Sequence, residues 1–375
     1  EDPISFGGRL KADFDSGDIP VIALVEDVTA EICARALDVG LDDVISPQCD
    51  DEELFARMRP LVRLATMHAE LRHRAQVAQT FGITARDRVD GPDNTAPAIL
   101  LIGDEAANIQ SMLGQSCDIT LSDNLYEAEG LLTQRNFDAA LIAFKDEPEG
   151  LLGFCSQVRN NPRLFNLPMV VLTSAETTDA YRRGATRVLP RSVDPVVLRS
   201  VMLTLVRRQQ LRWSIRGALN DSLQGTARDP VTGSYGRSFF DGYLANRLDS
   251  AKAQNRHLAA VFFSSPNVDG VRRQFGDDAA LHLTQQVGQW ITGLLRAEDL
   301  TAAYAPGEFC VILPDTPLAE AEVVMHRIAG VLAYTDFAVR EVYQPVKVWV
   351  QVGCTDSRDD DTMASLLARA RRNLD

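Results

Sequence analysis

Short apolar runs alternate with longer amphipathic stretches between residues 97 and 207. Continuous apolar runs at 98–102, near 139–142 and at 170–173 predict buried strands, and stretches with the apolar spacing of a helix follow them. Strands that alternate with helices in this way are typical of a parallel, doubly wound sheet. We therefore expect residues 97–207 to form five βα units around one such sheet.

A shorter version of the same pattern comes earlier in the chain. The segment 19–64 repeats in outline at 167–206, with two short strands around a helix and a turn through Asp into a long amphipathic helix. Asp50 and Asp194 suit that turn, because a carboxylate accepts the first amide hydrogens of a helix. Only about 18 residues precede the first copy, too few for three strands and two helices. Residues 1–82 are thus expected to be the C-terminal half of a domain plus a long helix.

The rest of the chain predicts a different architecture. Polar, turn-rich residues 83–96 indicate a linker, and the domain at 97–224 is expected to end in a connecting helix from about 196, broken at Gly225 and Pro230. Within 225–375 the pattern predicts a strand at 258–263, helices at 277–295 and 318–332, a hairpin at 301–313 and an antiparallel strand pair ending near 352. Helices beside a hairpin indicate an α+β fold with a mixed sheet. The predicted fold class is tandem doubly wound α/β units followed by an α+β domain.

Composition narrows the function classes. The chain is 45% hydrophobic and 24% charged, which excludes overall disorder, and 38 basic against 52 acidic residues give a net charge of -14. This balance argues against a general binder of DNA or anionic membranes, so an anionic ligand needs a local basic cluster. Cysteines and histidines show no metal-ligand spacing, and no apolar run reaches the roughly 18 residues of a membrane span. We expect a cytoplasmic protein without a metal, another cofactor or membrane insertion.

Residues 225–375 carry motifs that resemble the GGDEF domain of diguanylate cyclases. The matching segments are Asp229-Pro-Val-Thr-Gly233, Phe275-Gly-Asp-Asp278, Arg296-Ala-Glu-Asp299 and the hairpin segment from Ala305 to Thr316. Residues 97–207 resemble the receiver domain of response regulators, and 1–82 resembles the second half of another. The order receiver, receiver, GGDEF is similar to the PleD-type regulators, and within them to members with a degenerate signature. The resemblance implies CheY-like receivers and a nucleotide-cyclase-like GGDEF domain.

The resemblance also implies what a working cyclase needs at its hairpin signature. Two glycines let backbone approach the nucleotide, and the acidic third residue holds metal together with an Asp at the end of the first strand. Proline at the second position removes an N–H and fills space, and with Ser264 at the first-strand position Mg²⁺ lacks its carboxylate anchors. We therefore expect no catalytic residue: Glu308 is a polar hairpin residue and Phe309 begins a core strand. The signature positions are Ala305, Pro306, Gly307, Glu308 and Phe309.

Two further departures affect the nucleotide site. Arg272 and Leu281 stand where the family places the Asn and Asp that read guanine. The sequence also ends at Asp375, before the phosphate-binding Lys and Arg that the family has on its last helix. Together with the signature, these positions predict that GTP is not turned over.

The family's product-binding inhibitory site, by contrast, is complete. This site is an Arg-x-x-Asp whose Asp precedes the signature by six residues, the place of Arg296 and Asp299, and Arg327 matches a supporting Arg on the next helix. An Arg fork donates two parallel hydrogen bonds to O6 and N7 of guanine, and a carboxylate accepts from N1 and N2. Arg88 of the linker is predicted to reach a ligand trapped between receiver and GGDEF domains. The alternative is that Arg296 and Asp299 form a solvated pair at a helix end.

The receiver resemblance gives a parallel result. A receiver needs an acidic pair, a phosphoacceptor Asp, a Thr or Ser, and a Lys, at the ends of successive strands. Without a carboxylate at the acceptor position no aspartyl phosphate forms. In residues 97–207 the matching positions hold Gly103 and Asp104, Ala143, Thr173, and Arg191 or Pro190; in the first half-unit Val25 and Pro47 replace Thr and Lys.

Taken together, these patterns predict a non-enzymatic cyclic di-GMP effector. We expect it to form a homodimer through its receivers and to contact protein partners. By resemblance, the output is recruitment of adaptors or protease substrates to the cell pole for cell-cycle-regulated proteolysis. Two alternatives remain open: an active diguanylate cyclase with an unusual signature, and a scaffold that binds no ligand.

Overall fold

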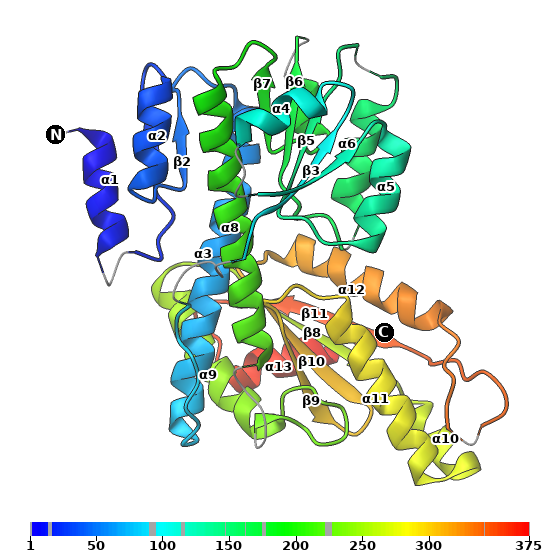
Figure 1. Cartoon of the computed structure of the whole chain (residues 1–375). Helices are drawn as coiled ribbons and strands as arrows, with labels where there is room; N and C mark the ends of the chain where they lie inside the picture. Colours follow the sequence, from blue (N-terminus) through cyan, green and yellow to red (C-terminus); the bar gives the residue numbers. More distant parts are fainter. Residues whose placement is uncertain are drawn as a thin grey trace. The chain divides into compact units, whose positions relative to one another are not determined.

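The computed structural model describes residues 2–13, 17–89, 95–113, 117–146, 148–161, 163–174, 178–221, 227–340 and 342–374. The chain forms two compact units (Figure 1). The first unit holds residues 1–68 and 89–215, and the second holds 69–88 and 216–375. Two long helices, α3 (Asp51–Thr80) and α8 (Pro195–Asp221), therefore contribute to both units. The predicted break at Gly225 and the linker residues 90–94 lie outside the described residues.

The first unit contains the predicted doubly wound sheet. Its strands are all parallel in the order β4-β3-β5-β6-β7, which confirms the expected α/β receiver-like fold. Strand bounds are β3 (Ala98–Ile102), β4 (Asp118–Ser122), β5 (Ala139–Ala143), β6 (Met169–Thr173) and β7 (Arg187–Pro190). Every residue of β5 and β6 is buried, as expected for strands with helices on both faces.

Helices cover the two faces of this sheet. Because side chains alternate along a strand, Leu101 packs toward α4 (Ala106–Leu113) and α8, while Leu100 and Ile102 face the opposite layer. The opposite layer consists of α5 (Leu125–Gln134), α6 (Leu151–Asn160) and α7 (Thr178–Arg182). Figure 1 shows α8 and α5 on opposite sides of the strands.

The first half-unit is a small parallel sheet within the same compact unit. The predicted strands are present as β1 (Ile22–Leu24) and β2 (Asp43–Ile45), joined by α2 (Ala30–Asp38). An unpredicted helix, α1 (Pro3–Ala12), begins with Asp2 accepting the Ser5 amide and with Pro at the first helical position. Its buried Ile4 packs with Ala23, Ala36, Leu41 and Val44.

A buried ionic cluster lies where the half-unit meets β7. Asp43 of β2 binds Arg57 of α3 at 2.7 Å and also contacts Arg187 of β7. The Asp43 side chain is only 7% exposed. Burial alone would raise the pKa of Asp43, but Arg187 and Arg57 outweigh it and hold the pKa at about 2. The carboxylate thus stays charged inside the first unit and links its two sheets.

The second unit is built on a four-stranded sheet in the order β11-β8-β10-β9. The bounds are β8 (Leu258–Ser264), β9 (Leu300–Ala305), β10 (Glu308–Pro314) and β11 (Gln351–Asp356). The expectation of a mixed sheet is wrong for these strands, because the β9–β10 hairpin folds back beside β8 and every strand pair is antiparallel. The strand predicted to end near 352 instead runs on to 356, preceded by an isolated bridge between Phe337 and Val346.

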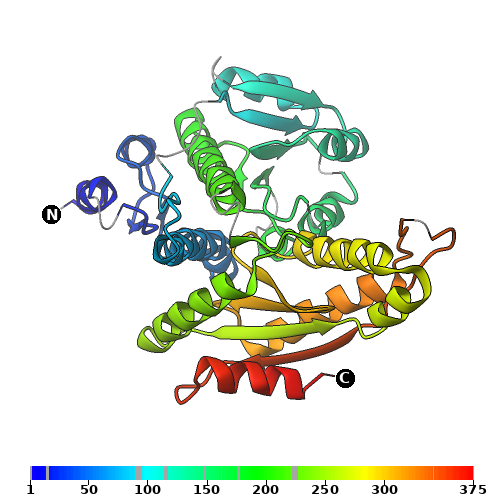
Figure 2. The same cartoon turned by 90° about the horizontal axis from the view of Figure 1, so that it is seen from below.

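Two helical layers enclose this sheet. One face packs on α10 (Val268–Phe275), α11 (Asp277–Gly293) and α12 (Leu318–Tyr334). The other face packs on α9 (Arg237–Ala253), α13 (Met363–Arg372) and Val77 and Ala78 of α3. Figure 2 shows α13 in red and α11 in yellow on opposite sides of the strands. No helix in the described part of the chain combines the length and the apolar character needed to cross a membrane.

Gly353 lets β11 approach α13 closely. A Cβ at this position would lie 2.3 Å from the backbone oxygen of Ala370, so neither strand nor helix can accommodate it without moving. We predict that Gly353→Ala lowers the free energy of unfolding by about 1 to 3 kcal/mol. The control is Gly330→Ala in α12, where a Cβ meets nothing within 4 Å. Because Ala favours a helix more than Gly does, this variant should raise the free energy of unfolding by roughly 0.5 to 1 kcal/mol. Urea unfolding of both variants checks this, and a Gly353→Ala protein as stable as wild type would contradict the packing.

Asp43 predicts a defined pH dependence in the first unit. The Asp43 carboxyl has a pKa of about 2 in the folded protein and about 3.9 in the unfolded chain. Its charge therefore stabilises the folded protein above pH 4, and this stabilisation is lost as the pH falls from 4 through 2. Asp43→Asn should lower the free energy of unfolding by about 3 kcal/mol at pH 7, because it leaves buried arginines unpaired. The difference in free energy of unfolding between the variant and wild type should become smaller from pH 4 to pH 3.

The matched control is Asp118→Asn, whose exposed pair with Arg135 should contribute less than about 1 kcal/mol. Urea unfolding at pH 7, 4 and 3 provides the comparison. A cost for Asp43→Asn that is the same at every pH would show that the carboxylate charge is not the source.

Candidate functional site

The residues compared with the family's signature form the turn between β9 and β10. Ala305 pairs with Glu308, so Pro306 and Gly307 are the two central residues of the hairpin. Proline supplies the fixed φ of the first central position, and Gly307 adopts φ +70, as a type II turn requires. The Gly307 carbonyl accepts the Ser265 amide at 2.9 Å. Pro306 and Gly307 thus give the turn its shape, and the Gly307 carbonyl fixes it to the residue after β8.

Glu308, the one acidic residue of the signature, forms an ion pair with the Arg371 side chain. Its Oε1 lies 2.9 Å from a guanidinium nitrogen of Arg371 on α13, and its strand neighbour on β8 is Ser264. The Arg371 guanidinium also lies 5.6 Å from the Tyr304 ring centroid. A metal ion at this hairpin would have to compete with Arg371 for Glu308, and Ser264 offers it no charge.

The other positions compared with the cyclases also have local roles. Arg272 pairs with Asp269 at 2.9 Å and Asp277 at 3.2 Å across the α10–α11 junction. Leu281 is 41% exposed on α11. Phe309 is buried, and its ring fits against α11 only because residue 288 is Gly: a Cβ there would lie 2.8 Å from the ring.

Arg296 and Asp299 close a tight turn between α11 and β9. The Arg296 amide donates to Oδ2 of Asp299 at 2.9 Å, and the Asp299 amide donates back to the Arg296 carbonyl at 3.2 Å. The Arg296 side chain is exposed, and Asp299 is half-buried. This turn, called the RxxD turn below, therefore has a fixed backbone and an accessible guanidinium.

The structure places Arg327 next to the RxxD turn. Arg327 lies on the exposed side of α12 and donates to the Leu294 carbonyl at 2.9 Å, two residues before Arg296. Leu294 caps the C-terminal end of α11, where carbonyls lack helical partners and a cation is favoured. Two of the predicted ligand-binding arginines are thus brought to the same end of α11.

Arg88 belongs to the same compact unit as the RxxD turn and is half-buried. The segment before it is anchored, since Ile83 and Ala85 pack against the core that contains α9 and α13. Its role as a ligand contact stays a prediction.

A contributor that sequence reasoning missed is Arg74 of α3. One terminal nitrogen of its buried guanidinium lies 2.7 Å, 3.0 Å and 3.3 Å from the carbonyl oxygens of Glu298, Asp299 and Ala297. Arg74 therefore binds the backbone of the RxxD turn from the buried side. Nothing in the local sequence distinguishes it from the other arginines of a helix that also carries Arg57, Arg59, Arg63 and Arg72.

The position that the resemblance compares with a receiver's phosphoacceptor is apolar. Ala143 is fully buried at the end of β5. The nearby carboxylates have other partners: Oδ1 of Asp104 accepts the Lys145 amide at 2.8 Å, and Glu105 lies 3.6 Å from Arg191. Thr173 is retained and buried.

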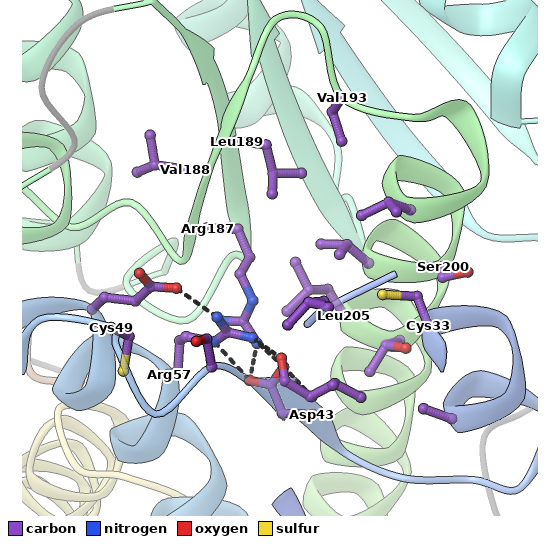
Figure 3. A pocket seen from close by; sticks show the side chains of 18 of the residues that line it. Cys33, Asp43, Cys49, Arg57, Arg187, Val188, Leu189, Val193, Ser200 and Leu205 are labelled. Carbon is purple, nitrogen blue, oxygen red and sulfur yellow. Dashed lines mark hydrogen bonds and ion pairs between the residues drawn. The ribbon is translucent and has the colours of Figure 1, made fainter. Parts of the chain in front are cut away.

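A cavity of about 600 Å³ lies in the first unit (Figure 3). Asp43, Arg57 and Arg187 meet at its floor, where their charges are paired, and Val188, Leu189, Val193 and Leu205 are among its apolar lining. Cys33 and Cys49 also line it, and burial raises the pKa of both thiols. Neutral thiols are poor nucleophiles, so the cavity offers space without evident reactive chemistry.

Comparisons with known proteins agree with this architecture. Residues 226–375 match the family model described as diguanylate cyclase, GGDEF domain. The response regulator PleD of Caulobacter vibrioides (strain NA1000 / CB15N) is 24% identical over 372 residues, covering 96% of this chain and 81% of PleD.

Solved structures of GGDEF domains match about two fifths of this chain. The GGDEF domain of YfiN (TpbB) from Pseudomonas aeruginosa is 26% identical with a TM-score of 0.36, covering 38% of this chain and 88% of that one. The GGDEF domain of DgcB from Caulobacter crescentus, solved in complex with c-di-GMP, is 16% identical with a TM-score of 0.38, covering 40% and 86%.

The alignment with PleD extends through both α/β sheets as well as the family-matched domain. The chain is thus similar to PleD over its two receiver-like α/β units and over residues 226–375, which match the GGDEF domain model.

Proposed function

We propose that this protein is a cyclic di-GMP effector that binds the dinucleotide at the RxxD turn and does not synthesise it. The observation that carries the proposal is the contrast between the two ends of β9. Before the strand, Arg296 and Asp299 form an ordered turn with Arg327 beside it. After the strand, the hairpin has lost its acidic third residue, and Glu308 is paired with Arg371.

The RxxD turn has the donors and acceptors that a guanine base needs. The exposed Arg296 fork can donate to O6 and N7, and the Asp299 carboxylate can accept from N1 and N2. Arg327 donates to the Leu294 carbonyl through one nitrogen, and a guanidinium has further N–H groups for a phosphate or a second base. In a chain of net charge -14, these two arginines supply the local positive charge that a doubly anionic ligand requires.

Catalysis is disfavoured by the same chemistry. Transfer of a nucleotidyl group from GTP needs divalent metal on the phosphates, held by carboxylates. Ser264 and Gly307 occupy the two expected ligand positions. Proline at 306 further limits how closely a phosphate can approach the turn.

The receiver-like units are proposed to serve assembly rather than phosphorelay. Ala143 provides no carboxylate for phosphorylation, so these sheets would act as surfaces for homodimerisation and for protein partners. We further propose that the liganded protein works in the cytoplasm, where it gathers adaptors or protease substrates at the cell pole during the cell cycle. Support for this last step is the resemblance to degenerate PleD-type regulators.

Calorimetric titration with cyclic di-GMP tests the site. Arg296→Ala removes a bidentate contact to guanine and should weaken binding by about 5- to 150-fold, or 1 to 3 kcal/mol. Arg273→Ala is the control, because Arg273 is an exposed arginine of α10 in the same domain, and it should bind like wild type. The fitted stoichiometry also distinguishes one ligand per site from a stacked pair.

Two outcomes would overturn the binding proposal. One is that cyclic di-GMP titrated into the wild-type protein releases or absorbs no heat and that a competition assay also detects no binding. The other is equal affinity in wild type and Arg296→Ala, which would place any bound ligand elsewhere and favour a surface role for Arg296 and Asp299.

The cyclase alternative is tested by incubation with GTP and Mg²⁺ followed by chromatography of the nucleotides. We expect GTP to remain intact, because the hairpin offers a metal only Glu308, already bound by Arg371. Formation of cyclic di-GMP by wild type that disappears in Glu308→Gln would establish an active enzyme instead.

A further inference from the structure

The RxxD turn rests on a side chain from a distant part of the sequence. Arg74 lies near the C-terminal end of α3, more than 200 positions before the turn it binds, and its side chain is 3% exposed. The carbonyl oxygens of Ala297, Glu298 and Asp299 converge on one of its nitrogens. A buried guanidinium is an effective way to satisfy several buried carbonyls that point the same way, because it carries several N–H donors and a charge.

Arg74 is itself held by a buried polar cluster. Glu70, one helical turn earlier on α3, is completely buried and lies 3.8 Å from Nε of Arg74. The same carboxylate accepts the Tyr243 hydroxyl at 2.5 Å and Nε of Arg247 at 2.7 Å. The Arg74 guanidinium also lies 5.7 Å from the Tyr235 ring centroid. These contacts limit the positions that the Arg74 fork can adopt.

Fixing the carbonyls of the turn has a consequence for its ligand-binding side. A peptide unit is planar, so orienting a carbonyl inward also orients the following amide group and fixes where the next Cα lies. Asp299 is constrained twice: its carbonyl accepts from Arg74, and its carboxylate accepts from the Arg296 amide. The positions of Arg296 and Asp299 therefore depend on Arg74.

We propose that Arg74 is a positioning residue for the RxxD turn, and that α3 sets the turn's affinity for its guanine ligand through it. This inference rests on the proposed cyclic di-GMP site. Arg74 does not touch the ligand; it lowers the cost of ordering the turn before binding.

Because α3 belongs to both compact units, the contact of Arg74 with the RxxD turn could regulate ligand binding. Residues 51–68 of the helix belong to the first compact unit, and residues 69–80 belong to the second. A displacement of α3 that withdraws Arg74 would weaken ligand binding, and by linkage the ligand stabilises the helix in its docked position. Helix α3 thus runs from the receiver-like half-unit into the unit that holds the proposed ligand site.

The experiment compares Arg74→Met and Arg74→Lys with Arg247→Met in the full chain. All three disturb the Glu70 cluster, but only the Arg74 variants alter a contact with the turn. A lysine keeps the charge yet offers a single point of contact in place of a fork. It therefore serves as the conservative variant if Arg74→Met fails to fold.

The first readout is amide hydrogen exchange of peptides covering 294–300 without ligand. Arg74→Met should exchange about tenfold faster there, Arg74→Lys should be intermediate, and Arg247→Met should match wild type at this segment even if its unfolding temperature falls. The second readout is calorimetry with cyclic di-GMP, in which Arg74→Met should bind about 2- to 10-fold more weakly and Arg247→Met like wild type.

The outcomes separate the two claims. If wild type binds no cyclic di-GMP but the exchange pattern holds, the ligand assignment fails and Arg74 still orders the turn. If both Arg74 variants exchange and bind like wild type, Arg74 has no positioning role and the inference is overturned. Equal acceleration in Arg247→Met would assign the effect to general loss of stability and also overturn it.

Discussion

A single buried carboxylate, Glu70, organises the part of the molecule on which the proposed function depends. Burying an unpaired charge costs several kcal/mol, so Glu70 requires its partners Tyr243 and Arg247. These contacts tie α3 to α9, while Arg74 beside Glu70 ties the same helix to the RxxD turn. One constraint thus accounts for both the docking of α3 on the GGDEF domain and the geometry of the turn.

The strand β9 separates two turns whose contacts differ. At its start, the RxxD turn is closed by its own hydrogen bonds and supported from below. At its end, Pro306 and Gly307 form the hairpin turn, and Glu308 is paired with Arg371. The strand itself keeps its place in the core through Leu300 and Ala302. The RxxD turn and the hairpin turn are thus held by separate sets of contacts at the two ends of one core strand.

Much of the fold follows from the sequence because apolar periodicity reports burial directly. The segments 98–102 and 258–263 are continuous apolar runs, and both form interior strands with covered faces. Apolar periodicity fails to predict burial where polar residues are buried. Arginines such as Arg247 of α9 and Arg74 of α3 are expected on the exposed side of a helix, yet both are buried beside Glu70. The positions of Arg296, Asp299 and Arg327 came from resemblance, but the support from Arg74 joins segments too distant for local patterns to reveal.

The central claim is that cyclic di-GMP binds the turn before β9 rather than the hairpin after it. Hydrogen exchange of the wild-type protein, followed by mass spectrometry with and without the ligand, tests this most directly. The account predicts ligand-dependent protection of 294–300, with no change in the hairpin at 303–310. Protection confined to 303–310, or no protection in either segment, would contradict it.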